Sequence, residues 1–333
     1  MNTFGRLFRI TIIGKSHGEI VGVVIDGCPT GLPLTIDDFK EDLKRRRPNL
    51  RGVTQRNEED IPFIKSGLYK GRTDGSPIVI LFENKDVLSK SYEEMAFLPR
   101  PGHADFVANK KYGGFNDPRG GGQFSGRMTV AICAAGVVAK KIIKPVETYA
   151  EVVEIGGKTD FLTLIEEAER SGDTLGGIVE CRVSNVPSGL GEPFFDSFES
   201  LVSHMVFSIP GVKGIEFGRG FDSSRMKGSE YNDEILSADG KTRTNNCGGV
   251  QGGITNGNDV VFRVAVRPTP SLKKKQWTID LKTGQRTEIE IKGRHDTCFA
   301  LRIPVILEAA CSIVIADLML MEQIIGRVWH ERE

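Results

Sequence analysis

The sequence carries no surplus of charge of either sign. Lysine and arginine together number 44 among 333 residues, and aspartate and glutamate also number 44, so the formal net charge is zero. Proteins that bind nucleic acid or an acidic membrane surface generally present a basic field. Aromatic residues do not alternate with the arginines, as they do in single-strand binders. The composition therefore predicts neither nucleic acid nor a membrane as a partner.

Metal-binding and disulfide patterns are absent as well. The cysteines form no C-x-x-C pair, and the sequence contains no H-E-x-x-H segment, so neither a zinc site nor a disulfide framework is expected. Unpaired thiols are typical of a reducing compartment, which predicts a cytoplasmic protein without a bound metal. The six cysteines are Cys28, Cys133, Cys181, Cys247, Cys298 and Cys311.

No segment has the pattern of a signal peptide or a membrane span. The N-terminal apolar run is interrupted by Arg6 and Arg9, which the apolar region of a signal peptide would not contain. The most apolar stretch, residues 304–321, includes Glu308 and Asp317. It is therefore predicted to form a buried core helix rather than a membrane-spanning helix.

Strand-like segments occur in adjacent runs and helical segments in blocks, instead of alternating strictly. This order predicts an α+β fold, a layered β-α-β sandwich with antiparallel sheets packed around central helices, in one domain over residues 1–333. Strands are expected at 7–14, 20–27, 61–73, 77–84, 176–189, 212–221 and 259–268, and helices at 36–47, 125–143, 195–208 and 304–325. Residues 85–124 lack periodicity, and so long an irregular segment is more often functional than idle.

A glycine-rich loop, NDPRGGGQFSGRMT, occupies residues 116–129. It lacks the lysine of a phosphate-binding Walker loop, and no strand precedes it as in a dinucleotide-binding fingerprint. A nucleotide-dependent kinase is therefore disfavoured, and so is a hydrolase, because no G-x-S-x-G elbow is present. The loop opens a helix whose free N–H groups could bind an anion. Its bare glycine backbone is expected to let a flat ligand lie against it.

Histidines are few, yet three of the five lie in loops beside glycine or arginine: His17 in GKSHGE, His103 in RPGHAD and His295 in KGRHDT. Histidine exchanges a proton near neutral pH without any perturbation, so these loops are candidates for an active site. The other two histidines are assigned to structure or solvent.

Arginines recur in the same irregular segments. The guanidinium group matches carboxylate and phosphate geometry, so this distribution predicts a ligand with several anionic groups. Arginines at the C-terminal end of a helix also compensate the helix dipole, and this accounts for one or two of Arg45, Arg46 and Arg47. The arginines in question are Arg45, Arg46, Arg47, Arg51, Arg56, Arg100, Arg119, Arg127, Arg267 and Arg294.

Taken together, these motifs resemble those of the chorismate synthase family. In chain order they are GKSHG, RRRP, TDGSPI, RPGHAD, RGGGQFSGRMT, GLGEPFFD, KGIEFGRGF, GGITNG, RPT and RHDT, and they span nearly the whole chain. The resemblance implies a lyase of the shikimate pathway of aromatic amino-acid biosynthesis. Its substrate would be 5-enolpyruvylshikimate 3-phosphate, from which phosphate and a hydrogen leave by anti 1,4-elimination to give chorismate. Reduced FMN would be required, although no net redox change occurs.

The resemblance also implies roles for individual residues. His17 would protonate the leaving phosphate, His103 would manage a proton on the reduced flavin, and Asp296 would help deprotonate flavin N5. The substrate's anionic groups would be bound by Arg46, Arg51, Arg100, Arg127 and Arg294. The FMN contacts would be Gln123, Phe124, Ser125, Gly252, Arg267, Pro268, Thr269, Pro270, Ser271 and Arg294.

The chain departs from the family pattern in and beyond its glycine-rich loop. Gln123, Phe124 and Gly126 stand where the family has Arg, Ser and Ala, and Lys15 and Arg267 replace a Glu and a Lys. An alternative reading is therefore a catalytically impaired homologue that still binds flavin or a phospho-ligand. The resemblance further implies a homotetramer. It leaves open whether NADPH reduces the FMN on this chain or an external flavin reductase supplies it, and the absence of an obvious extra domain favours the external reductase.

Overall fold

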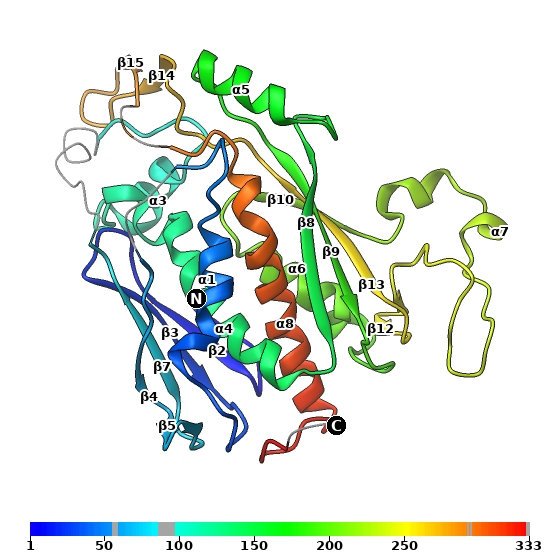
Figure 1. Cartoon of the computed structure of the whole chain (residues 1–333). Coiled ribbons are helices and arrows are strands. Elements are labelled where there is room, and N and C mark those ends of the chain that lie inside the picture. The colour runs from blue at the N-terminus through cyan, green and yellow to red at the C-terminus, as the bar shows by residue number, and fades with distance from the viewer. Residues whose placement is uncertain (55–58, 86–96, 292, 294, 331–333) are drawn as a thin grey trace.

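The first sheet is antiparallel and has the strand order β1-β2-β3-β7-β4. The computed structural model describes residues 1–333 except 55–58, 86–96, 292, 294 and 331–333 (Figure 1). The strands are β1 (Thr3–Phe4), β2 (Arg9–Gly14), β3 (Ile20–Asp26), β4 (Phe63–Ser66) and β7 (Ile78–Glu83). On β7 every second side chain is buried, as expected of a strand with one face on the core.

The second sheet is also antiparallel, with the order β10-β13-β9-β8. Its strands are β8 (Glu147–Ile155), β9 (Gly177–Ser184), β10 (Val212–Phe217) and β13 (Val260–Val266). The register of β9 against β13 is unbroken from Val183–Val260 to Gly177–Val266. Val179, Cys181 and Val183 on β9 are fully buried, so this sheet too turns one face to the core.

The central helices are α1 (Lys40–Arg46), α4 (Thr129–Ile142), α6 (Phe198–Val206) and α8 (Ile303–Met321). α4 packs on the first sheet and α8 on the second, and α6 contacts α8 and β10 (Figure 1). A Cβ atom at Gly136 of α4 would lie 2.2 Å from the Cβ of Ala309 on α8, so glycine is what lets the two helices pack this closely. Phe299–Met321 is long and apolar enough to cross a membrane, but 89% of its most apolar window is buried inside the fold. It is therefore the core helix that the sequence predicted.

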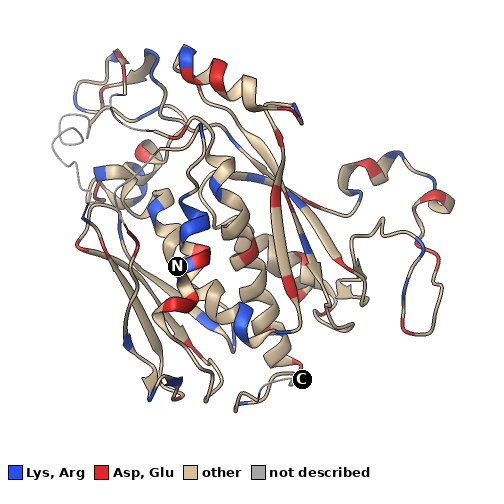
Figure 2. Ribbon diagram, viewed as in Figure 1, with Lys and Arg blue, Asp and Glu red and all other residues tan. Residues whose placement is uncertain are grey.

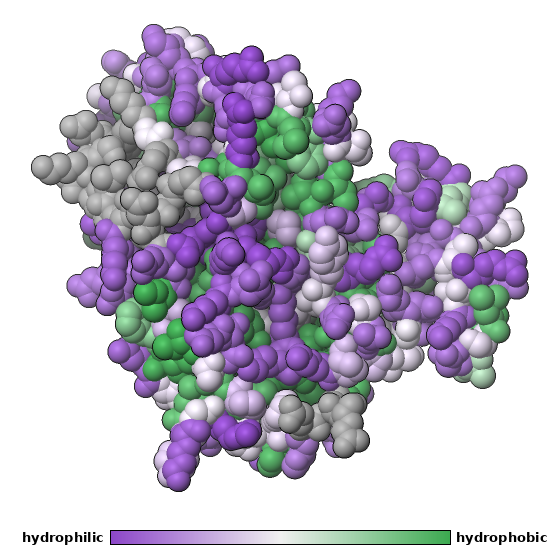
Figure 3. Space-filling view, viewed as in Figure 1, coloured by the Kyte–Doolittle hydropathy of each residue, from purple (hydrophilic) through white to green (hydrophobic). Residues whose placement is uncertain are grey.

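Two carboxylates on α8 bind polar groups of neighbouring elements. Glu308 accepts hydrogen bonds from Arg45, Lys140 and the backbone N–H of Ala150. Asp317 accepts from the backbone N–H groups of residues 6–8 at 2.6–3.0 Å. Glu308 is thus paired with two cations and Asp317 is hydrogen-bonded by backbone N–H groups, the conditions under which a core tolerates a carboxylate. Acidic and basic residues are interspersed elsewhere, and most of the face seen in Figure 3 is hydrophilic (Figures 2 and 3).

The remaining helices, strands and turns are short and lie outside the two main sheets. They are β5 (Leu68–Tyr69), β6 (Arg72–Thr73), α3 (Asp105–Tyr112), α5 (Leu162–Ser171), α7 (Gly228–Tyr231), β11 (Val250–Gln251), β12 (Ile254–Thr255), β14 (Gln276–Ile279) and β15 (Arg286–Ile289), with six short 3-10 turns, η1 (Ile36–Phe39), η2 (Arg119–Phe124), η3 (Gly126–Met128), η4 (Phe194–Asp196), η5 (Gly220–Arg225) and η6 (Phe299–Arg302). The segment around α7 projects away from the body of the molecule in Figure 1.

The α+β prediction is confirmed: helices and antiparallel sheets form separate blocks. The helix predicted at 36–47 is present, but it begins as the 3-10 turn η1 and becomes α-helical at Lys40. Three differences concern less regular segments. α3 lies inside residues 85–124, where no helix was expected. The segment 61–73, expected as one strand, instead contains β4, which pairs with β7, and then β5 and β6, which pair across a tight turn at 70–71. β8 and α5 were not anticipated.

Candidate active site

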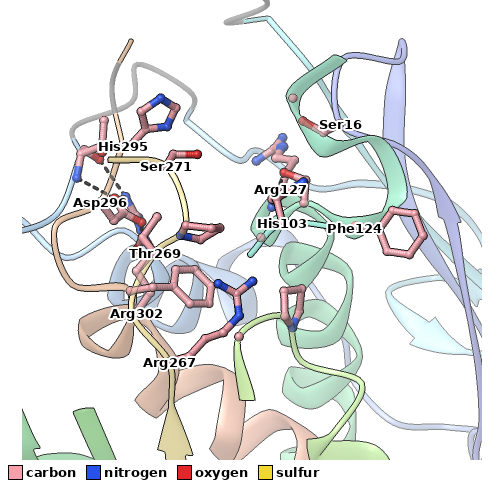
Figure 4. A pocket seen from close by; sticks show the side chains of 18 of the residues that line it. Ser16, His103, Phe124, Arg127, Arg267, Thr269, Ser271, His295, Asp296 and Arg302 are labelled. Carbon is pink, nitrogen blue, oxygen red and sulfur yellow. Dashed lines mark hydrogen bonds and ion pairs between the residues drawn. The ribbon is translucent and has the colours of Figure 1, made fainter. Parts of the chain in front are cut away.

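The largest group of sequence-predicted site residues surrounds one cavity. The cavity encloses about 1270 Å³, counted to its open mouth. Figure 4 shows Ser16, His103 and Arg127 on one side and Ser271, Thr269 and Asp296 on the other. The predicted residues in its lining are His17, Arg46, Arg100, His103, Phe124, Ser125, Arg127, Arg267, Pro268, Thr269, Pro270, Ser271, His295 and Asp296. Segments far apart in the chain therefore converge here.

The glycine triplet packs against the two candidate catalytic histidines. Gly120, Gly121 and Gly122 all have positive φ, at 56°, 81° and 54°. A Cβ at Gly120 would lie 2.4 Å from the His17 ring, and one at Gly121 would lie 3.1 Å from the His103 ring. The space that side chains at Gly120 and Gly121 would fill is taken by the two imidazoles, so these glycines make room for the histidines. Gly120 also lines the cavity, and the contact of a flat ligand with this backbone stays a prediction.

His17 sits in the tight connection from β2 to β3, and its backbone has a φ of 61°. Such a conformation is uncommon for a residue other than glycine and marks a position that its surroundings enforce. The Nδ2 atom of Asn84 donates to the carbonyls of Lys15 and Gly18 on either side of it, at 3.1 and 2.8 Å. Ser16 N–H donates to the carbonyl of Gly122. The imidazole is thus presented to the cavity by a braced loop.

His103 belongs to a hydrogen-bonded group with an aspartate and an arginine. Its Nδ1 lies 2.6 Å from Asp105 Oδ1, and the Arg100 Nε donates to Asp105 Oδ2 at 2.7 Å. Burial raises the pKa of Asp105, but the hydrogen bonds from Arg100 and His103 outweigh it and hold that pKa far below its usual range. An ionised Asp105 accepts a hydrogen bond from Nδ1–H, so this contact fixes the ring and its tautomer.

Two of the predicted arginines meet over a buried carboxylate. The guanidinium groups of Arg46 and Arg127 both bind Asp60, whose side chain is fully buried. Arg127 is 4% exposed and also donates from Nε to Asn84 Oδ1 at 2.9 Å. Arg46 comes from the end of α1 and Arg127 from η3, so the pair joins two elements at one wall of the cavity.

Asp296 is held by an ion pair on the opposite side. Arg302 donates to both carboxylate oxygens at 2.8 and 3.0 Å, and Thr54 N–H donates at 2.7 Å. Burial raises the pKa of Asp296, while the Arg302 contact and the Thr54 hydrogen bonds lower it, and the net direction is downward. Asp296 is therefore ionised, and its lowered pKa makes it a weaker base than an ordinary aspartate.

Rings and proline side chains make the remaining part of the lining less polar. Phe124 and Phe299 belong to the lining together with four prolines. Arg267 also lines the cavity: it donates from its backbone N–H to the carbonyl of Gly211 at 2.9 Å, and burial lowers the pKa of its side chain. The prolines are Pro48, Pro210, Pro268 and Pro270.

Several predicted residues do not line this cavity, among them Arg45 and Arg119, which pair with Glu308 and Asp117. Arg56 lies outside the described residues. Arg51 is exposed and pairs with Glu166 and Glu169 of α5 at 2.5 and 3.0 Å. Gly252 forms the tight turn between β11 and β12, where its φ of 62° favours glycine. Gln123 lines a separate cavity beside the N-terminal strands. Arg294 falls among the residues that the structure does not describe.

Several functional neighbours were missed from the sequence. Asp105 could have been found, because it follows His103 by two positions within RPGHAD. Arg47, already among the candidate arginines, also lines the cavity. Asp60 and Arg302 carry no local signal: Asp60 binds Arg127, and Arg302 donates to the carbonyls of Arg46 and Thr54, all from distant segments.

Comparisons with known proteins agree on one family. The chorismate synthase family model matches residues 8–320. A chorismate synthase of Chitinophaga pinensis is 57% identical over 330 residues, covering 99% of each chain. One of Korarchaeum cryptofilum is 46% identical over 346 residues, covering 94% of this chain and 96% of its own. A solved structure, described as the crystal structure of chorismate synthase, matches with a TM-score of 0.75 at 28% identity, covering 96% of this chain and 93% of its own. The chain therefore belongs to the chorismate synthase family.

Proposed function

We propose that the cavity is where this chain carries out the reaction of its family, the anti 1,4-elimination of phosphate from 5-enolpyruvylshikimate 3-phosphate to give chorismate. The observation that carries the proposal is the convergence of Arg46, Arg100 and Arg127 with His17 and His103 around one cavity. The substrate bears a phosphate and two carboxylates. Preformed guanidinium groups are what such a ligand requires, because they bind oxyanions in forked geometry.

Reduced FMN is proposed to bind in the same cavity as the substrate, because the lining combines cations with apolar rings. Phe124, Phe299 and the neighbouring prolines offer apolar surface for a flat ring, and Arg267 is a cation beside them. Reduced FMN would supply electron density that assists the departure of phosphate. The segment 267–271 and residues 124–125 are the proposed contacts.

His17 is proposed as the acid that protonates the leaving phosphate. Its positive φ and its packing against Gly120 orient the ring to the cavity that Arg46 and Arg127 also line. Positioned acid catalysis of this kind typically contributes about 10²–10⁴-fold. His103 is proposed to exchange a proton with the reduced flavin through Nε2, since Nδ1 is bound to Asp105.

Asp296 is proposed to assist removal of the flavin N5 proton. Its pairing with Arg302 keeps it ionised while weakening it as a base. The role that fits best is therefore a hydrogen-bond acceptor that polarises an N–H group, rather than a free proton acceptor. Arg51, Gly252 and Gln123 have no part in this proposal, because they lie outside the cavity of this chain.

The departures from the family pattern are compatible with activity. Lys15 pairs with Asp117 at 2.9 Å, and Asp117 also binds Arg119, so the altered charge is compensated locally. Gln123 faces away from the cavity. An impaired flavin-binding homologue is the second candidate, and these contacts favour the active enzyme over it.

We further propose that residues 1–333 act as one catalytic domain with β-α-β layering, because lining residues come from segments next to both sheets. A cytoplasmic homotetramer is proposed from the family resemblance, with FMN reduced by an external flavin reductase. The alternative is that NADPH reduces FMN on this chain.

The proposal is tested by anaerobic turnover of the purified chain with 5-enolpyruvylshikimate 3-phosphate, measuring chorismate by absorbance and phosphate in parallel. Chemically reduced FMN should support turnover, whereas oxidised FMN with NADPH should not. Turnover with oxidised FMN and NADPH, without another reductant, would show that this chain reduces FMN itself. Binding of FMN and substrate without product would favour the impaired homologue.

A further inference from the structure

The carboxylate of Asp60 lies under the arginine wall of the cavity. Its side chain is 0% exposed and binds the guanidinium groups of Arg46 and Arg127. The Nε of Arg47 lies 3.4 Å from the same carboxylate. All three arginines line the cavity, whereas Asp60 does not. It therefore acts on any bound ligand only through them.

The backbone of Asp60 is itself constrained. Its φ is 51°, in the left-handed region that aspartate and asparagine enter more readily than most residues. Burial opposes ionisation of Asp60, but the charges of Arg46 and Arg127 lower its pKa, so the carboxylate is charged. An isolated buried charge is costly, and it persists in a fold when it is paired and hydrogen-bonded.

Three guanidinium groups brought to one wall repel one another. Asp60 supplies a negative charge between them, which offsets part of this repulsion. The carboxylate also fixes where two of those groups lie, because it binds one nitrogen of each. A site that is built before the ligand arrives loses less free energy on ordering its side chains.

We propose that Asp60 is the positioning residue of the anion site: it holds Arg46 and Arg127 side by side so that together they bind the phosphate or a carboxylate of the substrate. This assignment rests on the proposed function for the identity of the substrate, but not for the existence of an anion site.

The inference can be distinguished from a simple charge effect, because the two predict opposite changes in the anion affinity of Asp60→Asn. If Asp60 mattered only through its charge, Asp60→Asn would make the wall more positive and tighten anion binding. If Asp60 positions the arginines, the same change weakens binding despite the added positive charge. Asparagine has the same shape and tolerates the same backbone conformation, so the variant is a clean test.

The control is Glu308→Gln. Glu308 is also a buried carboxylate bound by two cations, Arg45 and Lys140, and it does not line the cavity. Its loss removes a comparable ion pair from the core and lowers thermal stability for the same physical reason. A change of ligand affinity in Asp60→Asn that Glu308→Gln lacks is therefore not a consequence of lower stability.

The experiment measures binding of inorganic phosphate to the full chain by calorimetry, and KM and kcat with reduced FMN. For Asp60→Asn we expect phosphate affinity to fall and KM to rise by about ten- to a hundredfold, with a smaller change in kcat. Asp60→Glu, which keeps the charge but displaces it by one methylene group, should also bind phosphate more weakly. Glu308→Gln should bind it as the unmodified chain does.

Unchanged or tighter phosphate binding in Asp60→Asn would overturn the inference, and so would unmodified affinity in Asp60→Glu. If Asp60→Asn does not fold, Asp60→Glu decides alone. Should the unmodified chain bind phosphate in an Asp60-dependent manner yet release none from the substrate, the proposed function fails and the anion site stands.

Discussion

Gly120→Ala should reduce turnover by displacing His17, while leaving the rest of the protein folded. The added Cβ would lie 2.4 Å from the His17 ring, whereas ordinary contacts begin at 3.4 Å. The ring must therefore move by about 1 Å, and a misplacement of that size can cost about a hundredfold in rate. Placing alanine in the left-handed region costs a further 1–2 kcal/mol or so of stability.

The matched control is Gly113→Ala at the end of α3. Gly113 has φ 61° and ψ 26°, against 56° and 20° at Gly120, so the backbone strain is the same. Its Cβ would meet only one atom within 4 Å, at 3.8 Å, on Phe115. Both variants should lose similar thermal stability, but kcat with reduced FMN should fall about a hundredfold only in Gly120→Ala. Equal turnover in the two variants would refute the role of the glycine in orienting His17.

Three further predictions follow from the same site. His17→Ala should retain FMN and substrate binding but lose about 10²–10⁴-fold in kcat, and the unmodified rate should decline as rising pH deprotonates the imidazole; near-normal turnover would reduce His17 to a turn residue. Arg127→Ala should weaken substrate binding by about 2–5 kcal/mol, measured by titration, and unchanged affinity would remove Arg127 from the site. Because the pKa of Asp105 is lowered on folding from the ordinary aspartate value of 3.8, its stabilising contribution is present above that value and is lost as pH falls below it. The free energy of unfolding of Asp105→Asn, measured in urea, should accordingly depend less on pH in this range than that of the unmodified chain. Parallel plots of this free energy against pH for the two proteins would contradict the linkage.

Elements with a distinctive local composition could be predicted from the sequence. α4 and α8 are apolar on nearly every face, so their place in the core could be predicted from composition. α3, with the sequence DFVANKKY, has no apolar stripe. It is fixed by the contacts of Asp105 rather than by burial of one face. Its existence therefore could not be inferred from periodicity.

Parts of the site were beyond sequence reasoning because they depend on which segments meet. Arg51 was expected at the substrate, but α5 brings Glu166 and Glu169 to it, and the ion pairs hold it at the surface. Asp60 lies between Arg46 and Arg127 only after folding. The glycine triplet was recognised as unusual, yet its contacts with His17 and His103 come from distant loops.

The central claim is that one cavity holds the substrate and reduced FMN and releases phosphate without consuming the flavin. The most direct test is the molar ratio of phosphate released to FMN present, measured anaerobically with substrate in large excess and no other reductant. The account predicts many phosphates and an equal amount of chorismate for each FMN, with the flavin still reduced at the end by its absorbance. At most one phosphate per FMN, accompanied by flavin oxidation, would contradict it.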